Sequence, residues 1–93
     1  MHLLEHRRVQ SMSLPSELQR EINKWSKKLE EKLMRITAVD DVGEEMLENI
    51  HAYQKDSQHF LKTDNLVKSF ECLIWAWAFL EIATQLKHLN EKT

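Results

Sequence analysis

Apolar residues recur with helical spacing in the first part of the chain. Between positions 14 and 36 they are separated by four, four, three, four, four and three residues, which keeps them on one stripe of a helix. The stripe consists of Leu14, Leu18, Ile22, Trp25, Leu29, Leu33 and Ile36. Pro15 suits a first helical turn because its ring holds φ close to the helical value. The pattern predicts a helix over about 15–36.

A second helix is predicted over about 42–62. Asp41 and Glu44 have the spacing of a capping box, and acidic residues favour the N-terminus of a helix. One arc of this helix carries the residues that we expect to be buried: Met46, Leu47, Ile50, Tyr53, Ser57, Phe60 and Leu61. A short polar connection follows, in which we expect Asp64 to cap the next helix.

The third helix, predicted over about 65–89, differs because it is apolar on two opposite sides. One stripe consists of Leu66, Phe70, Leu73, Trp77 and Leu80, and the other of Cys72, Trp75, Phe79, Ile82, Leu86 and Leu89. At 100° per residue these stripes point roughly 180° apart. A helix in a three-helix bundle contacts its two neighbours over one broad arc, so the second stripe needs additional cover.

We expect the first stripe to lie in the core of the monomer and the second to be a candidate interface. The candidate interface consists of four residues of the second stripe, Trp75, Phe79, Ile82 and Leu86. Large aromatic side chains contribute strongly to interface energetics, which makes Trp75 the most informative of the four. Three kinds of cover remain open: a second copy or another protein, the N-terminal arm with Leu3, Leu4, Val9 and Met12, or simple exposure to solvent.

These patterns predict an all-α fold, an antiparallel three-helix bundle with short connections. The chain of 93 residues suits one domain, which we place at 14–93 after an N-terminal arm at 1–13 that is flexible or packed on the third helix. One Gly and one Pro in the whole chain agree with long helices and few turns.

Charge and apolar runs limit the classes of partner. The net charge of −2 and the pI near 6.2 give no support for binding to nucleic acid or to an anionic membrane. The longest apolar run, from Cys72 to Leu80, is nine residues, too short to span a bilayer. The first ten residues lack the continuous apolar run of a secretory signal, so we expect a cytoplasmic protein.

Few residues support catalysis or cofactor binding. A single Gly excludes phosphate-binding loops and nucleophile elbows. Glu48 and His51 form one Glu-x-x-His pair, whereas di-iron bundles use two such pairs and two further carboxylates. The single cysteine, Cys72, lies in an apolar run, where an inert thiol is expected. We therefore expect no catalytic residue, no cofactor and no bound metal.

The second half of the chain contains a recognisable series of residues. They are Tyr53, Asp56, Ser57, Phe60, Asp64, Phe70, Glu71, Trp75, Ala76 and Leu80. This series resembles an archaeal family of small helical proteins, domain-of-unknown-function family 357. The sequence departs from the family pattern at Thr63, where Gly is usual, and at Ser69, where Ala is usual. The resemblance implies an all-helical cytoplasmic protein with no established activity, and it singles out Asp56 and Glu71 as a candidate polar site.

The sequence favours a non-enzymatic protein-interaction module. It would be homo-oligomeric through the third helix, as a homodimer, or would bind another protein there. The alternative is a small-molecule or metal-binding helical bundle whose site includes Asp56 and Glu71. An enzyme acting alone is the third hypothesis. Neither nucleic acid nor membrane is expected as a partner.

Overall fold

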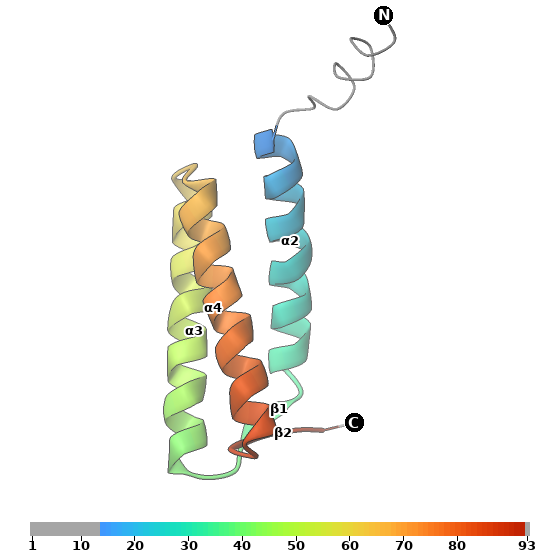
Figure 1. Cartoon of the computed structure of the whole chain (residues 1–93), viewed down its shortest axis with the longest axis vertical. Helices are drawn as coiled ribbons and strands as arrows, with labels where there is room; N and C mark the ends of the chain where they lie inside the picture. Colours follow the sequence, from blue (N-terminus) through green and yellow to red (C-terminus); the bar gives the residue numbers. More distant parts are fainter. Residues whose placement is uncertain (1–13, 93) are drawn as a thin grey trace, which may run out of the picture.

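Three helices and two short strands make up the computed structural model, which describes residues 14–92. In chain order they are α2 (Leu14–Leu33), β1 (Ile36–Ala38), α3 (Asp41–Lys62), α4 (Leu66–Gln85) and β2 (Leu89–Glu91). In Figure 1 the chain runs down α2, up α3 and down α4. The expected three-helix all-α bundle is therefore confirmed in outline, with a small sheet added. The predicted arm at 1–13 lies outside the described residues.

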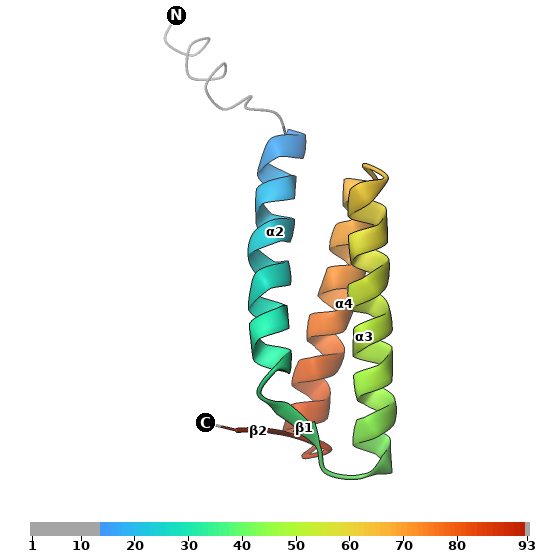
Figure 2. The same ribbon diagram turned by 180° about the vertical axis from the view of Figure 1, so that it is seen from behind.

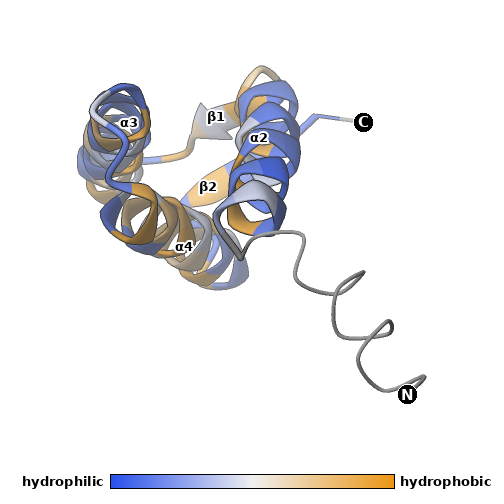
Figure 3. Ribbon diagram, turned by 90° about the horizontal axis from the view of Figure 1, so that it is seen from above, coloured by the Kyte–Doolittle hydropathy of each residue, from blue (hydrophilic) through white to orange (hydrophobic). Residues whose placement is uncertain are grey.

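Helix α4 lies between the other two helices. Figure 3, which looks along the helices, shows α3 on one side of α4 and α2 on the other. α3 and α4 pack closely against each other, whereas α2 packs mainly on α4. The buried apolar side chains are Ile22, Leu29, Ile36, Ile50, Leu73, Ala76, Leu80, Ala83 and Leu89. Four of the nine belong to α4, which makes it the centre of the core.

Small residues line the contact between α3 and α4. On α3 the buried residues are Gly43, Ile50 and Ser57, and three of the buried residues on α4 are Ser69, Ala76 and Ala83. Both series repeat every seven residues, which returns to the same face of a helix. In helices that run in opposite directions, a pairing of Ser57 with Ser69 brings Ile50 level with Ala76. Glycine, serine and alanine at these levels, with Ile50 as the one large residue of the two series, let the two helices approach closely.

Two reciprocal hydrogen bonds join the helices at one end of this contact. Ser57 Oγ donates to the carbonyl oxygen of Ser69 at 2.8 Å, and Ser69 Oγ donates to the carbonyl oxygen of Ser57 at 2.7 Å. Both side chains are buried. Ser69, where the family pattern has Ala, therefore adds a second donor to the contact without adding bulk.

The turn between α3 and α4 uses a left-handed residue. Asp64 has a φ of 63°, and the N–H of Asn65 donates to the carbonyl oxygen of Phe60 at 2.8 Å, as in a Schellman motif. Asn65 is the N-cap of α4, because its side chain accepts from the N–H of Lys68. The prediction that Asp64 caps this helix was wrong. Thr63 has a φ of −93°, so the loss of the family's Gly at this position causes no backbone strain.

A two-stranded antiparallel sheet closes the opposite end of the bundle (Figure 2). Its register pairs Ile36 with Glu91, Thr37 with Asn90 and Ala38 with Leu89. Beyond the strands, the N–H of Lys92 donates to the carbonyl oxygen of Arg35 at 2.8 Å. The side chain of Arg35 also forms an ion pair with Glu91, at 3.2 Å between Nη2 and Oε2. The end of the chain is thus tied to the segment that follows α2.

Both helices that lead into this sheet are shorter than predicted. The helix expected over 15–36 ends at Leu33, and the one expected over 65–89 ends at Gln85. Ile36 and Leu89 are instead buried as strand residues. The spacing was misleading here because both residues face the core in either conformation. Past α4, Lys87 adopts a φ of 68° and turns the chain toward β1.

Asp40 links the start of α3 to the end of α4. One carboxylate oxygen accepts the N–H of Gly43 at 2.8 Å, and the other lies 2.8 Å from Nδ1 of His88. Asp40, and not the predicted Asp41, is therefore the N-cap. A Cβ atom at Gly43 would collide with the carbonyl oxygen of His88, so this corner requires glycine. The hydrogen bond from Gly43 and the pairing with His88 hold the pKa of Asp40 below its ordinary value.

The serine contact can be tested by substitution at Ser69. We expect Ser69→Ala, which restores the family residue, to cost about 1 kcal/mol of unfolding free energy through one lost hydrogen bond. Ser69→Leu should cost about 3 kcal/mol because the close helix contact leaves no room for the larger side chain. Urea denaturation measures both. As a control, Gln58→Leu at an exposed position of α3 should stay within about 0.5 kcal/mol. Equal losses at Ser69 for alanine and leucine would contradict the close contact.

The role of Asp40 can be tested through pH. Its folded pKa is depressed, so the stability that it contributes is present above the unfolded value near 4 and is lost as pH falls through the folded pKa. We expect Asp40→Ala to lower the thermal midpoint at pH 7 by roughly 5 °C. Below about pH 4, the thermal midpoint of the variant should fall less steeply with decreasing pH than that of the wild type. Circular dichroism melts from pH 7 to 2 measure this. In Asp41→Ala, one residue away, the thermal midpoint should fall with decreasing pH as it does in the wild type.

Candidate functional site

The stripe expected in the core does face inward. Leu73 and Leu80 are buried, and Leu66, Phe70 and Trp77 pack against the core in half-buried positions. The opposite side of α4 remains largely in solvent. We define the outer face of α4 as its large exposed apolar residues: Val67 (61% exposed), Ile74 (50%), Trp75 (54%), Ile82 (49%) and Leu86 (63%). At 100° per residue they share one continuous arc about 120° wide.

The outer face includes residues that the two-stripe pattern missed. Val67 and Ile74 belong to neither stripe, yet each is at least half exposed. A helix that is apolar nearly all round gives no contrast by which a third side can be recognised. Figure 3 shows this composition as the extensive hydrophobic colouring of α4.

Helix α3 covers part of the predicted interface. The ring of Tyr53 stacks on Phe79 with centroids 5.7 Å apart and on Trp75 with centroids 6.4 Å apart. The two α4 rings are themselves 6.0 Å apart. Phe79 is consequently half-buried and belongs partly to the monomer. Trp75, Ile82 and Leu86, the other three candidates, remain exposed.

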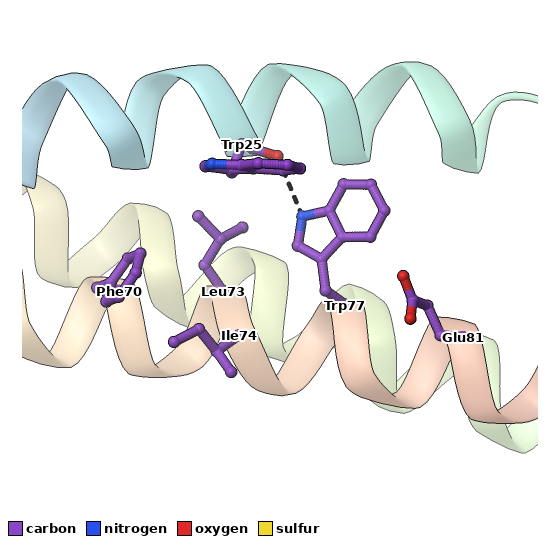
Figure 4. A pocket seen from close by; sticks show the side chains of 6 residues that line it. All are labelled: Trp25, Phe70, Leu73, Ile74, Trp77 and Glu81. Atoms are coloured by element: carbon purple, nitrogen blue, oxygen red, sulfur yellow. Dashed lines mark hydrogen bonds between the residues drawn. The ribbon is translucent and has the colours of Figure 1, made fainter.

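An aromatic pocket lies on the other side of α4, where α2 packs on it. Its volume is about 270 Å³, and its lining consists of Trp25, Phe70, Leu73, Ile74, Trp77 and Glu81. Figure 4 shows the Trp25 ring above the α4 side chains and Trp77 at one side of the pocket. The two indoles meet edge to face, with centroids 5.8 Å apart and planes at 89°. Trp77 Nε1 donates to the carbonyl oxygen of Trp25 at 3.3 Å, which fixes α2 against α4.

Charged residues surround the Trp25 ring. Lys28 Nζ lies 4.8 Å from the ring centroid, and Lys24 Nζ lies 5.6 Å from it. Trp25 Nε1 donates to Glu21 at 3.2 Å. Two of the lysines on the basic side of α2 therefore contact the indole of Trp25. Glu81, at the edge of the pocket, has no hydrogen bond or ion pair with any residue in 14–92.

The two carboxylates of the candidate polar site lie at the surface. Asp56 and Glu71 are both exposed, and both influence the thiol of Cys72. Burial, and then the charges of Asp56 and Glu71, raise the pKa of Cys72 above its ordinary value. The thiolate is disfavoured there, so the environment of Cys72 does not suit a nucleophile. Neither carboxylate lines the aromatic pocket.

The Glu48 and His51 pair lies at the surface. His51 Nδ1 is 3.3 Å from the side-chain oxygen of Gln54, and both Glu48 and His51 are exposed. Within residues 14–92, no three His, Cys, Asp or Glu side chains gather closely enough to hold a metal ion. Among the described residues, α2, α3 and α4 all lack the continuous apolar length that a membrane-spanning helix requires.

The fold and its exposed helix define a small three-helix protein whose central helix has one uncovered apolar side. A family model, described as protein of unknown function (DUF357), matches residues 24–89, and the chain belongs to that family. The chain is similar to the crystal structure of protein AF1782 from Archaeoglobus fulgidus, with 44% identity and a TM-score of 0.79. That match covers 86% of this chain and 100% of the other. No curated protein matches the chain.

The surface position of Glu48 and His51 leads to a prediction about metal ions. We expect neither Zn²⁺ nor Fe²⁺ to raise the thermal midpoint, because a ligand stabilises a fold only to the extent that it binds the folded state. Differential scanning calorimetry with and without each ion measures this. A rise that disappears in His51→Ala but persists in His59→Ala would instead establish a metal site at His51.

Proposed function

We propose that this protein is a non-enzymatic interaction module that forms a homodimer through the outer face of α4. The observation that carries the proposal is the exposure of Val67, Ile74, Trp75, Ile82 and Leu86 along one helix. α4 contacts α3 and α2 mainly with its remaining surface, and these five residues stay about half exposed although Tyr53 of α3 stacks on Trp75. A second copy of the chain offers a face of matching length and apolar character.

The exposed area agrees with what a dimer needs. These side chains leave on the order of 500 Å² of apolar surface in water, about the upper limit for a monomeric protein. Two such faces would together bury on the order of 1,000 Å², the lower limit of a specific interface. Burial of the two copies of Trp75 would contribute strongly, since large aromatic residues dominate interface energetics.

The order of residues on α4 favours an antiparallel pairing of the two copies. Trp75 and Ile82 lie on either side of Ala78, the smallest residue near the middle of the outer face. A twofold axis close to Ala78 would place Trp75 of one copy against Ile82 of the other, as an isologous contact requires. The small Ala78 side chain would allow the two helix axes to approach closely there.

The alternative function, a ligand site built on Asp56 and Glu71, has less support. Both carboxylates are exposed, and neither has a hydrogen bond or ion pair with another residue in 14–92. A site built to hold a ligand combines concavity with convergent polar groups. Asp56 and Glu71 do not line the aromatic pocket, and both side chains are exposed.

The homodimer can be tested with Ile82→Glu. This substitution places a charge at the centre of the proposed contact twice per dimer, and Ile82 is about half exposed in the monomer. We expect it to weaken association by at least about a hundredfold, because each copy would bury an unpaired carboxylate. Sedimentation equilibrium measures the mass, and circular dichroism should show that the helices are retained. Phe79→Glu is a poorer choice because Phe79 stacks on Tyr53 within the monomer.

A matched control is Met34→Glu, which introduces the same charge at an exposed apolar residue outside α4. The Met34→Glu variant should sediment as the wild type does. A wild-type protein that sediments as a monomer would exclude the homodimer. Dissociation by Met34→Glu and Ile82→Glu alike would place the contact elsewhere.

A further inference from the structure

We propose that the pocket between Trp25 and Trp77 binds an alkylated ammonium group, such as a quaternary ammonium or a methylated amine. This site is separate from the proposed dimer contact, since its lining shares only Ile74 with the outer face of α4. The residues that carry the inference are two indoles, one phenyl ring and one carboxylate that converge on a single cavity.

The walls of the pocket are aromatic on three sides. Trp25 lies over the α4 side chains from α2, Phe70 stands at one end of their row, and Trp77 stands between Ile74 and Glu81, as Figure 4 shows. The edge-to-face contact of the indoles and the hydrogen bond from Trp77 Nε1 to Trp25 hold both rings in place. Aromatic faces attract cations through their quadrupole, and rigid rings lose little entropy when a ligand binds.

The lining favours a cation with an apolar surface over an anion or a strongly hydrated ion. Leu73 and Ile74 also line the pocket and offer no hydrogen-bond donors or acceptors from their side chains. Glu81 supplies the one charged side chain of the lining, and no residue in 14–92 neutralises it by an ion pair. A trimethylammonium group combines methyl contacts with a diffuse positive charge, which matches both features.

The Trp25 ring already attracts ammonium groups within the protein. Two lysines of α2 place their Nζ atoms 4.8 and 5.6 Å from its centroid. Neither lysine is among the residues that line the pocket. The cavity of about 270 Å³ is large enough for a trimethylammonium group with a short substituent.

The experiment compares choline with 3,3-dimethylbutan-1-ol, in which carbon replaces the charged nitrogen. Binding is followed by the indole N–H resonances of the three tryptophans in ¹H–¹⁵N spectra of the full chain. We expect choline to shift the Trp25 and Trp77 signals saturably and to leave Trp75, which lies on the outer face, unchanged. The neutral analogue should bind about fivefold more weakly.

Two substitutions separate charge recognition from packing. Glu81→Gln should remove most of the preference for choline while the neutral analogue still binds. Glu71→Gln, which changes another exposed carboxylate of α4 outside the pocket, should leave the preference intact. Circular dichroism should show unchanged helices in both variants.

Three results would overturn the proposal. Equal affinity for choline and the neutral analogue would reduce the site to an apolar cavity. A shift confined to Trp75 would place binding on the outer face. Absence of a saturable shift with either compound would show that the pocket binds neither.

Discussion

The close contact between α3 and α4 determines how the rest of the molecule is arranged. Ser57 and Ser69 bond each other's backbone across it, and small residues repeat every seven positions along α4 from Ser69 through Ala76 to Ala83. Because the middle of the side toward α3 is filled by small side chains, most large apolar residues of α4 lie elsewhere on the helix, and Phe79 stacks on Tyr53 at the margin of the contact. Leu73, Phe70 and Trp77 face α2, and Trp75, Ile82 and Leu86 face solvent. One close contact therefore produces both the aromatic pocket and the outer face.

Helix α2 is held by fewer contacts than α3, and those contacts shape the pocket. Trp25 and Trp77 join α2 to α4 near the middle, while the pairing of β1 with β2 and the link from Asp40 to His88 secure the lower end (Figures 1 and 2). An aromatic edge-to-face contact holds two helices farther apart than a serine contact does. The space left beside the Trp25 ring is the pocket lined by Ile74 and Glu81.

Periodicity predicted the three helices and the inward stripe on α4, but it could not predict where helices end. Ile36 and Leu89 fit the helical spacing of their stripes although each lies in a strand. Both residues are buried, and an apolar residue at either position fits a helix and a strand equally well. The strands form through a pairing of segments more than fifty residues apart, which no local pattern reveals. Trp75 and Trp77 do point to opposite sides of α4, as their spacing predicted. The stacking of Tyr53 on Phe79 depends on how α3 and α4 are rotated against each other, so it needed the structure.

The division of α4 into three surfaces separates the contacts that hold the fold from the surfaces proposed to bind. A helix that is apolar all round is ordinarily buried on every side, because exposed apolar area favours association. Here the surface of α4 toward α3 carries Ser69, Ala76 and Ala83, whereas Ile82 and Leu86 are exposed and take no part in that contact. Glu81 is equally remote from the serine contact, since it lies at the edge of the pocket beside α2. Substitutions in the outer face or in the pocket therefore test the proposed binding without removing the α3–α4 contact on which the fold depends.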